Sequence, residues 1–222
     1  YKLLIMHLFS YKLEHDFGLA PNPFGGTMSL AVCRGQIRNS KALQLGDWIV
    51  GTGSVAMGNL YHLIFAMKVE EIISFDDYWS DIRFQYKKPV LNGTLVQMYG
   101  DNFYHTVNGQ LVQEPSAHSN PNSIIKQKLY NQDVRGKRVL LSKTFYYFGD
   151  NCPLLPDNYL NICCNGRSVK YKTITEQQVC DFVSWLEENY TVGIHGDPCN
   201  WKEFKLQKLD IFDDGIEKNN NP

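Results

Sequence analysis

Two histidines lie in stretches whose composition excludes regular structure and leaves the side chain free for chemistry. His15 lies in HDFGLAPNPFGG, where prolines and glycines exclude both a helix and a central strand. His118 lies in the polar stretch PSAHSNPNS. Loops present side chains to ligands, and imidazole exchanges protons near neutral pH. We therefore predict His15 or His118 as a general base, with Asp16 or Asp101 as its partner.

The loop that contains His15 is predicted to form a rigid rim of a ligand site. Its prolines pre-set the backbone, and its glycines allow the backbone to approach another group closely. Its His, Asp and Asn have no structural task that Ser or Gly could not perform. Neighbouring side chains on an extended backbone face opposite ways, so His15 and Asp16 need not act on each other.

Aromatic residues make up 13% of the chain, and several stand beside turns, acids and amides. Rings for stacking and polar groups for reading exocyclic atoms are what a base-binding pocket needs. On a strand, the run FYYFG at 145–149 could supply both a core face and an exposed aromatic face. The alternative is that the rings only fill the core. The predicted ligand-binding residues are Asp16, Asn22, Phe24, Gly25, Trp48, Tyr78, Trp79, Arg83, Asp101, Asn102, Tyr104, Tyr146 and Tyr147.

Familiar cofactor and nucleophile motifs do not occur in the sequence. GTGSVAMG at 51–58 lacks the spacing and the lysine of a phosphate-binding loop, and there is no Gly-x-Ser-x-Gly motif. The six cysteines form no CxxC pair. Cys163 and Cys164 make a single cluster, whereas zinc usually draws paired ligands from two places. We expect no metal, no cofactor and reduced cysteines that fill space.

The composition is that of an ordinary globular protein. Of 222 residues, 43% are hydrophobic and 20% charged, and the formal net charge is -1. This balance argues against a protein that coats DNA or a membrane surface. LLIMHLF at 3–9 is shorter than the roughly 20 residues of a membrane helix, and no small-residue cleavage site follows it. We expect a cytoplasmic protein with one domain over 1–222, and the oligomeric state stays open.

Hydrophobic patterns predict a β-rich chain. Alternation of Phe9, Tyr11 and Leu13 with polar residues is the period of a half-buried strand. LLIMHLF is interpreted as a buried strand that leads into it. Further strands are predicted at 27–33, 46–53, 62–73, 93–99, 137–142 and 143–149.

Helix signals are fewer. Ser74 and Asp77 predict the start of a short helix, and 123–132 predicts another. In TEQQVCDFVSWLEENY, the apolar residues recur at helical steps behind a capping box of Thr175 and Gln178. The residues from about 213 are interpreted as a frayed tail. The predicted fold is α+β, a mixed sheet or partly closed barrel with peripheral helices, its helical C-terminal portion at about 174–212.

Five blocks in order resemble a known family. They are FSYKLEHDFGLAPNPFGGTMSLAVCRGQIR, GDWIVGTGS, LIFAMKVEEIISFDDYWSDIRFQYKKP, GDNFYH and FYYFG, and they span roughly residues 8–150. Together they resemble the phage and bacterial family called the nucleotide modification-associated domain, second type. The resemblance implies an association with systems that make or process modified bases, with a nucleotide or modified base, free or in DNA, as the partner. The order of turns and strands is more loosely similar to PUA-like domains (EVE, ASCH and YTH), which implies a base-binding pocket.

Three functions remain open. The leading hypothesis is a domain that binds a modified base or nucleotide in an aromatic-lined pocket. The second is an enzyme that acts on a nucleotide or base through a His/Asp pair, and the third is a protein-interaction module of a modification or defence system. If nucleic acid binds, the predicted basic contacts, which could equally form a solvated face, are Lys87, Lys88, Lys126, Lys128, Arg135, Lys137 and Arg138.

Overall fold

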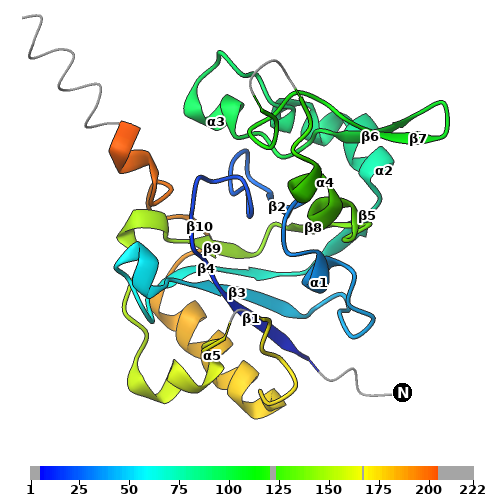
Figure 1. The fold of residues 1–222 in the computed structure, drawn as a ribbon. Helices are drawn as coiled ribbons and strands as arrows, with labels where there is room; N and C mark the ends of the chain where they lie inside the picture. The colour runs from blue at the N-terminus through cyan, green and yellow to red at the C-terminus, as the bar shows by residue number, and fades with distance from the viewer. Residues whose placement is uncertain (1–5, 121–123, 167, 205–222) are drawn as a thin grey trace, which may run out of the picture.

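A five-stranded mixed sheet forms the centre of the protein. The computed structural model describes residues 6–120, 124–166 and 168–204. The strand order is β1-β3-β4-β9-β10 (Figure 1), with β1 parallel to β3, β9 parallel to β10 and the other neighbours antiparallel. The bounds are β1 Leu8–Lys12, β3 Trp48–Thr52, β4 Leu63–Lys68, β9 Phe145–Tyr147 and β10 Gly193–Ile194. The α+β class is as predicted, but the sheet keeps two edges and does not close into a barrel.

Two smaller sheets lie on one side of the central sheet in Figure 1. Three antiparallel strands in the order β2-β8-β5 make the first, and the hairpin β6-β7 makes the second. The bounds are β2 Met28–Leu30, β5 Glu71–Ile73, β6 Tyr104–Val107, β7 Gln110–Gln113 and β8 Val139–Ser142. These sheets carry the helices that surround the candidate site.

Helix α5 covers the opposite side of the central sheet (Figure 1). Its apolar face, Val179, Phe182 and Leu186, is fully buried and packs in one cluster with Trp48 and Tyr146 of the sheet. The helices are α1 Gly35–Arg38, α2 Phe75–Ser80, α3 Leu95–Met98, α4 Gln127–Val134 and α5 Glu176–Asn189, with short 3-10 segments η1 Val55–Met57, η2 Ile82–Lys87, η4 Gly149–Asn151 and η5 Asp157–Ile162.

Both helix starts predicted from capping residues are confirmed. Ser74 accepts a hydrogen bond from the Asp77 amide and Thr175 from the Gln178 amide, and each third residue returns a side-chain contact to the cap. Such caps satisfy amide groups that the first turn leaves unpaired. The cap of α5 fixes where its apolar stripe begins, and so which face meets the sheet.

Three predictions about elements are wrong. Residues 93–99 were expected as a strand but contain α3, which begins behind a capping box of Thr94 and Gln97. The strand predicted over 62–73 is divided between β4 and β5, because the chain leaves one sheet after Lys68 and enters another at Glu71. The expected exposed aromatic face of the 145–149 run does not exist, since both sides of this central strand are covered and all four rings are buried.

β1 is more buried than the sequence predicted, and two other predictions fall partly or wholly outside the described residues. β1 is buried on both faces from Leu8 to Tyr11, because layers cover both sides of the sheet, whereas its alternation predicted a half-buried strand. The start of the 3–9 run and the tail from about 213 lie outside the described residues. Within the described ranges, every helix is too short or too polar to span a bilayer.

Truncation of the Leu186 side chain should show how strongly the stability of the protein depends on the packing of α5 against the sheet. Leu186→Ala is expected to lower the free energy of unfolding by about 2–5 kcal/mol, because a fully buried leucine loses its contacts and leaves a cavity. Glu187→Ala, on the exposed side of the same turn, is the matched control and should change stability by less than about 0.5 kcal/mol. Urea unfolding measures both, and equal losses would contradict this packing.

Candidate functional site

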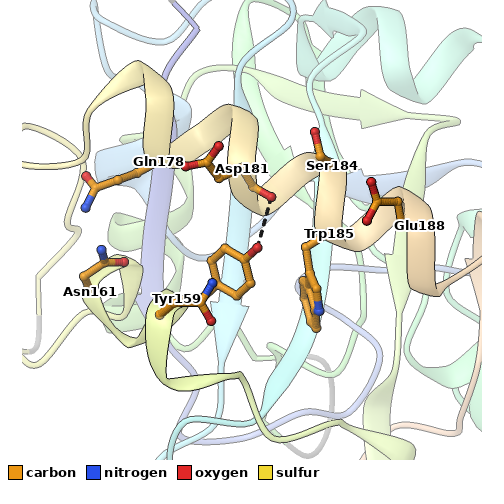
Figure 2. Close-up of a pocket in the computed structure, with 8 residues that line it drawn as sticks. Tyr159, Asn161, Gln178, Asp181, Ser184, Trp185 and Glu188 are labelled. Carbon is orange, nitrogen blue, oxygen red and sulfur yellow. Dashed lines mark hydrogen bonds between the residues drawn. The ribbon is translucent and has the colours of Figure 1, made fainter.

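A cavity of about 820 Å³ lies among the described residues, and the loop 13–20, the turn 33–36 and helix α4 all contribute to its wall. A second, smaller hollow of about 400 Å³ lies between η5 and α5 (Figure 2). There, Tyr159 donates a hydrogen bond to the backbone oxygen of Asp181, and the other lining side chains are mainly acids and amides. No histidine, cysteine or lysine lines this groove. The larger cavity is therefore the candidate site.

Cys33, His118 and Asp133 form a hydrogen-bonded line at the wall of the larger cavity. The Cys33 Sγ lies 3.8 Å from Nε2 of His118, and Nδ1 of the same ring lies 2.7 Å from the Asp133 carboxylate. Cys33 and His118 both line the cavity, whereas Asp133 is fully buried behind them. A nucleophile, a base and a carboxylate that orients the base are the parts of a covalent catalyst.

The chain reaches Cys33 through a sharp turn. Strand β2 ends at Leu30, helix α1 begins at Gly35, and the turn between them places Cys33 at φ 55° and Arg34 at φ 38°. Two consecutive non-glycine residues in the left-handed region are costly and persist only where the surroundings enforce them. A strand, a strained nucleophile and a helix in this order resemble a nucleophile elbow, which exposes a reactive side chain at a turn.

Glycines at two positions allow helix α1 to approach α4. A Cβ added at Gly35 would lie 2.7 Å from the Gln132 backbone oxygen, and one at Gly136 would lie 2.2 Å from the Arg38 guanidinium carbon. Both positions therefore require glycine. The close approach brings Asp133 of α4 against the turn that carries Cys33.

The Asp133 carboxylate is satisfied on both oxygens. Oδ1 accepts the backbone N–H of Cys33 at 2.6 Å, while Oδ2 lies within hydrogen-bond distance of His118 and of the Tyr104 hydroxyl. Its backbone oxygen accepts from the fully buried Arg38, which also donates to the Cys33 carbonyl. Charge-assisted hydrogen bonds of this kind hold a buried ion in one place. The nucleophile and its base are thus positioned by one carboxylate.

His118 is held in its charged form. Burial opposes the charge, but hydrogen bonds with Asp133 and Cys33 outweigh it and raise the pKa of His118 to about 10. An imidazolium that faces a sulfur stabilises the thiolate and can later donate its proton. The predicted catalytic use of His118 stays a prediction, but its partner in the structure is Asp133 and not Asp16 or Asp101.

The same three side chains also have the chemistry of metal ligands. One ligand atom from each lies within 4.8 Å of the other two. However, Nδ1 of the His118 ring already faces Asp133, and Nε2 faces Cys33. The carboxylate oxygens are likewise engaged by an amide and a hydroxyl. These contacts favour a nucleophile and base over a metal centre.

Aromatic rings form another part of the cavity wall. Phe17 stacks against Tyr99 with ring centroids 5.3 Å apart, and the His15 ring stacks against Phe17 with centroids 6.0 Å apart. All three residues line the cavity. A row of flat rings beside a nucleophile suits a planar ligand. Of the predicted site residues, His15 and His118 are the two that line this cavity.

Buried polar bonds hold the loop at 15–26 in place. Asp16 accepts from the Tyr147 hydroxyl and from the amide of Cys199, and burial raises the pKa of this carboxyl. Asn22 accepts from the buried ammonium of Lys87 at 2.8 Å and donates to the Tyr99 carbonyl. Asp16 and Asn22 therefore face the protein, while His15 and Phe17 face the cavity. The loop is held by buried hydrogen bonds through two of the side chains expected to contact a ligand, and its role as the rim of a ligand site stays a prediction.

Most of the other predicted ligand residues are buried, and three of them, Tyr78, Asp101 and Asn102, belong to a second polar network. Asp101 accepts from Ser29 at 2.6 Å and from Tyr78 at 2.7 Å, and burial raises the pKa of its carboxyl. The Asn102 amide donates to two backbone carbonyls. At most 2% of each side chain is exposed for Trp48, Tyr78, Asp101, Asn102, Tyr104, Tyr146 and Tyr147. They act in the core and do not line the cavity.

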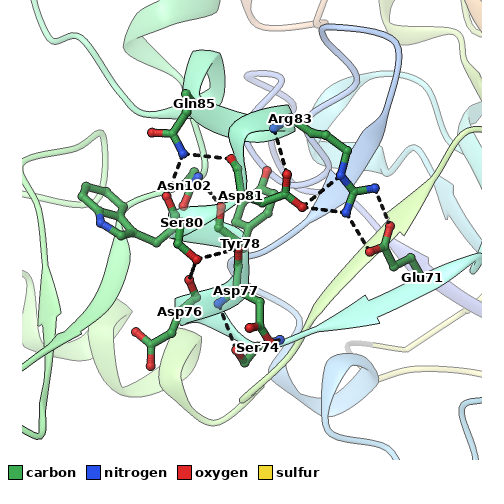
Figure 3. A network of polar contacts seen from close by, with 11 residues as sticks. Glu71, Ser74, Asp76, Asp77, Tyr78, Ser80, Asp81, Arg83, Gln85 and Asn102 are labelled. Atoms are coloured by element: carbon green, nitrogen blue, oxygen red, sulfur yellow. Dashed lines mark hydrogen bonds and ion pairs between the residues drawn. The ribbon is translucent and has the colours of Figure 1, made fainter.

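The remaining predicted residues lie on the surface around α2 and at the loop tip. Figure 3 shows the Arg83 guanidinium held by Asp81 and Glu71, at 2.6 and 2.8 Å, so its charge is paired with two acids of the same surface. The Trp79 ring stacks on His105 at 4.0 Å. Phe24 stacks on Trp201, and the Gly25 carbonyl accepts from Tyr86. None of these side chains lines the cavity, so their role as ligand contacts stays a prediction.

Sequence reasoning missed Cys33 and Asp133. The signal for Cys33 is present as Ala31-Val32-Cys33-Arg34-Gly35, a small residue, a nucleophile and a glycine at the spacing of a nucleophile elbow. Ala31 stands where the serine motif has its first glycine, and Cys33 stands where it has its serine. No local signal marks Asp133, which follows Cys33 by 100 residues and meets it only through folding.

Replacement of His118 should change how stability depends on pH. The pKa of His118 is raised by folding from its ordinary value near 6.5 to about 10, so the stabilisation is complete below about pH 6.5 and is lost as pH rises through about 10. The difference in unfolding free energy between wild type and His118→Gln should therefore shrink by about 1.4 kcal/mol per pH unit over this window. Urea unfolding at pH 6 and pH 10.5 measures it. His15→Gln, at an exposed position, is the control, and a gap that stays constant would contradict the ion pair.

Comparisons with known proteins agree with the resemblance noted in the sequence. Neither the curated proteins nor the solved structures contain a match to this chain, so the looser similarity to PUA-like domains is not confirmed. One family model matches residues 5–205, well beyond the blocks at 8–150. The match includes the loop, the β2–α1 turn, His118 and Asp133. The chain belongs to the family described as nucleotide modification associated domain 2.

Proposed function

We propose that this protein is an enzyme of nucleotide modification that binds a nucleotide or modified base in the 820 Å³ cavity and acts on it through Cys33. The observation that carries the proposal is the hydrogen-bonded line of Cys33, His118 and Asp133 at the cavity wall. The family description supports the substrate class, and the geometry supports the chemistry. A cytoplasmic location belongs to the proposal, since a free thiol nucleophile needs a reducing compartment.

Binding would use the aromatic wall. A volume of about 820 Å³ lies within the range of pockets that enclose small ligands. The stacked rings of Phe17 and Tyr99 offer a base a flat surface, and the polar edge of His15 extends it. The pocket is therefore lined by aromatics, as the leading hypothesis from the sequence requires, but by a different set.

The chemical step proposed begins with a thiol addition. In this step the Cys33 proton passes to Nε2 of His118, and the sulfur attacks an electrophilic carbon of the bound ligand to form an S–C bond. The π electron pair of the attacked double bond moves to the adjoining atom, which takes the proton from Nε2 of His118. Asp133 keeps the ring oriented through both transfers. A leaving group on the attacked carbon then departs with that proton as the double bond re-forms. Water adds to the same carbon and the S–C bond breaks, which restores the thiolate and leaves a hydroxyl in place of the leaving group.

The two other hypotheses have less support. A domain that only binds a base has no use for a strained turn at the cysteine that faces His118, because two consecutive non-glycine residues in the left-handed region carry a cost in stability. A protein-interaction module would be expected to present a broad apolar patch and no concave pocket. The cavity, with its convergent polar groups, favours a small ligand.

Cys33→Ser should abolish turnover and preserve binding. The protein is incubated with canonical and modified nucleosides, nucleotides and short DNA, and the products are identified by mass spectrometry. For the ligand that reacts, Cys33→Ser and His118→Asn should each lower kcat at least about 10³-fold, because both remove a partner in the covalent step. The stabilisation of the folded protein by that ligand, measured as a rise in Tm, should persist.

Cys180→Ser is the matched control, since this cysteine is exposed on α5 and away from the cavity, and it should keep full activity. Unchanged turnover in Cys33→Ser would refute the proposal. Activity that a chelator removes and zinc restores would instead assign the three residues to a metal.

A further inference from the structure

The guanidinium of Arg34 is fixed beside the nucleophile. Arg34 directly follows Cys33 and shares its strained turn, with φ 38°. Its Nη2 donates to the Lys12 carbonyl at 2.7 Å, and its Cζ lies 4.2 Å over the Tyr11 ring. A guanidinium has five N–H donors in a planar fork, and this hydrogen bond uses one of them. Arg34 lines the cavity, so its remaining donors are available to a ligand there.

Tyr11 adds an independent sign of a missing partner. Its side chain is fully buried and lines the cavity, yet its hydroxyl has no hydrogen-bond partner among the residues described. Burial raises the pKa of Tyr11, although the charge and a side-chain contact of the neighbouring Arg34 guanidinium oppose this, so the hydroxyl keeps its proton and can donate. Buried hydroxyls are normally satisfied, and one that is not at a ligand cavity points to an acceptor that the ligand supplies.

The charge of the cavity wall favours an anion. Arg34 and Arg135 line it, against Glu14 as the one carboxylate residue among its lining side chains. His118 adds an imidazolium on the same wall, because the pKa of its ring is raised to about 10. Arg135 follows the last residue of α4 and lies next to the turn that carries Arg34, because a Cβ added at Gly35 would lie 3.3 Å from the Cβ of Arg135.

We propose that Arg34 and Tyr11 form a phosphate-binding subsite beside Cys33, with Arg135 at its rim. The inference rests on the proposed function and narrows its substrate class to a ligand that carries a phosphate. The planar guanidinium of Arg34 and the neutral hydroxyl of Tyr11 can both donate hydrogen bonds to phosphate oxygens. A guanidinium can donate to two such oxygens at once. The base would then lie against Phe17 and Tyr99, and the phosphate against Arg34.

The source of the phosphate is either a free nucleotide or a nucleotide residue within a DNA strand. Both present the same charged oxygens to Arg34. A free 5′-monophosphate carries a terminal group, whereas a strand carries internal diesters. The test below separates the two.

Protection of Cys33 from alkylation tests the subsite in the full chain. Iodoacetamide labelling of the Cys33 peptide is followed by mass spectrometry in the presence of four probes: the deoxynucleosides, their 5′-monophosphates, inorganic pyrophosphate and short single-stranded oligodeoxynucleotides. Phosphate-bearing probes should protect at concentrations at least about tenfold lower than the matching nucleosides. Arg34→Gln should remove this advantage, and Arg34→Lys should restore only part of it, because lysine lacks the fork. Lys41→Gln removes an exposed cation away from the cavity and should leave the advantage intact.

Each outcome of the labelling experiment either supports or overturns the proposed phosphate subsite. Protection by monophosphates supports it with a free nucleotide as ligand, and protection by oligonucleotides alone supports it with a strand as ligand. Equal protection by nucleosides and nucleotides in wild type overturns the subsite while base binding in the cavity stands. Failure of every phosphate-bearing probe, pyrophosphate included, also overturns the subsite, and the turnover of Cys33→Ser then decides the proposed function separately.

Discussion

The buried carboxylate of Asp133 is the constraint on which the candidate site depends. It has no contact with solvent, so its charge must be met by donors inside the protein, and it receives the Cys33 amide, the His118 ring and the Tyr104 hydroxyl. These donors come from the β2–α1 turn, the segment after β7 and strand β6. A change in any one of them would leave a buried charge short of a partner. The need to pair this one buried carboxylate with donors therefore fixes the relative positions of three chain segments.

Arg38 completes this arrangement from the other side. Its guanidinium is fully buried and donates to the backbone carbonyls of Cys33, Asp133 and Arg138. Burial lowers the pKa of Arg38 to about 10, although the nearby Asp133 charge opposes that change. The strained turn at Cys33 is thus held by a carboxylate on its amide and by a guanidinium on its carbonyl. Strain kept in place by such strong bonds is a common property of reactive sites.

A separate buried network of hydrogen bonds involves the loop that contributes to the cavity wall. Lys87 donates to Asn22 and to Ser29, and Ser29 donates to Asp101, so a buried ammonium and a buried carboxylate are joined through one hydroxyl. Burial lowers the pKa of Lys87 to about 8. This network holds the loop that presents His15 and Phe17. The acids and amides that were predicted to contact a base form these supporting hydrogen bonds instead. The rings of His15 and Phe17 face the cavity.

The sequence by itself determined the local elements and the class of the fold. Capping boxes at Ser74 and Thr175, the periodicity of α5 and the apolar runs of β3, β8 and β9 each depend on residues within one or two turns of one another, so they can be read locally. It also carried the blocks that resemble the family, and the elbow pattern around Cys33. The secondary structure predicted for 62–73 and 93–99 was wrong, because there it depends on the sheet or helix against which the segment packs.

Only the tertiary structure decided which polar residues serve the core and which face the cavity. A histidine, an aspartate or a tyrosine has the same type in either place, and its burial depends on partners far along the chain. Asp16 meets Tyr147 across 131 residues, and Cys33 meets Asp133 across 100. The free energy that fixes these pairs comes from the removal of charge and hydroxyl groups from water, which happens only when the layers close together. The spacing of residues along the sequence therefore does not reveal which of them form these pairs.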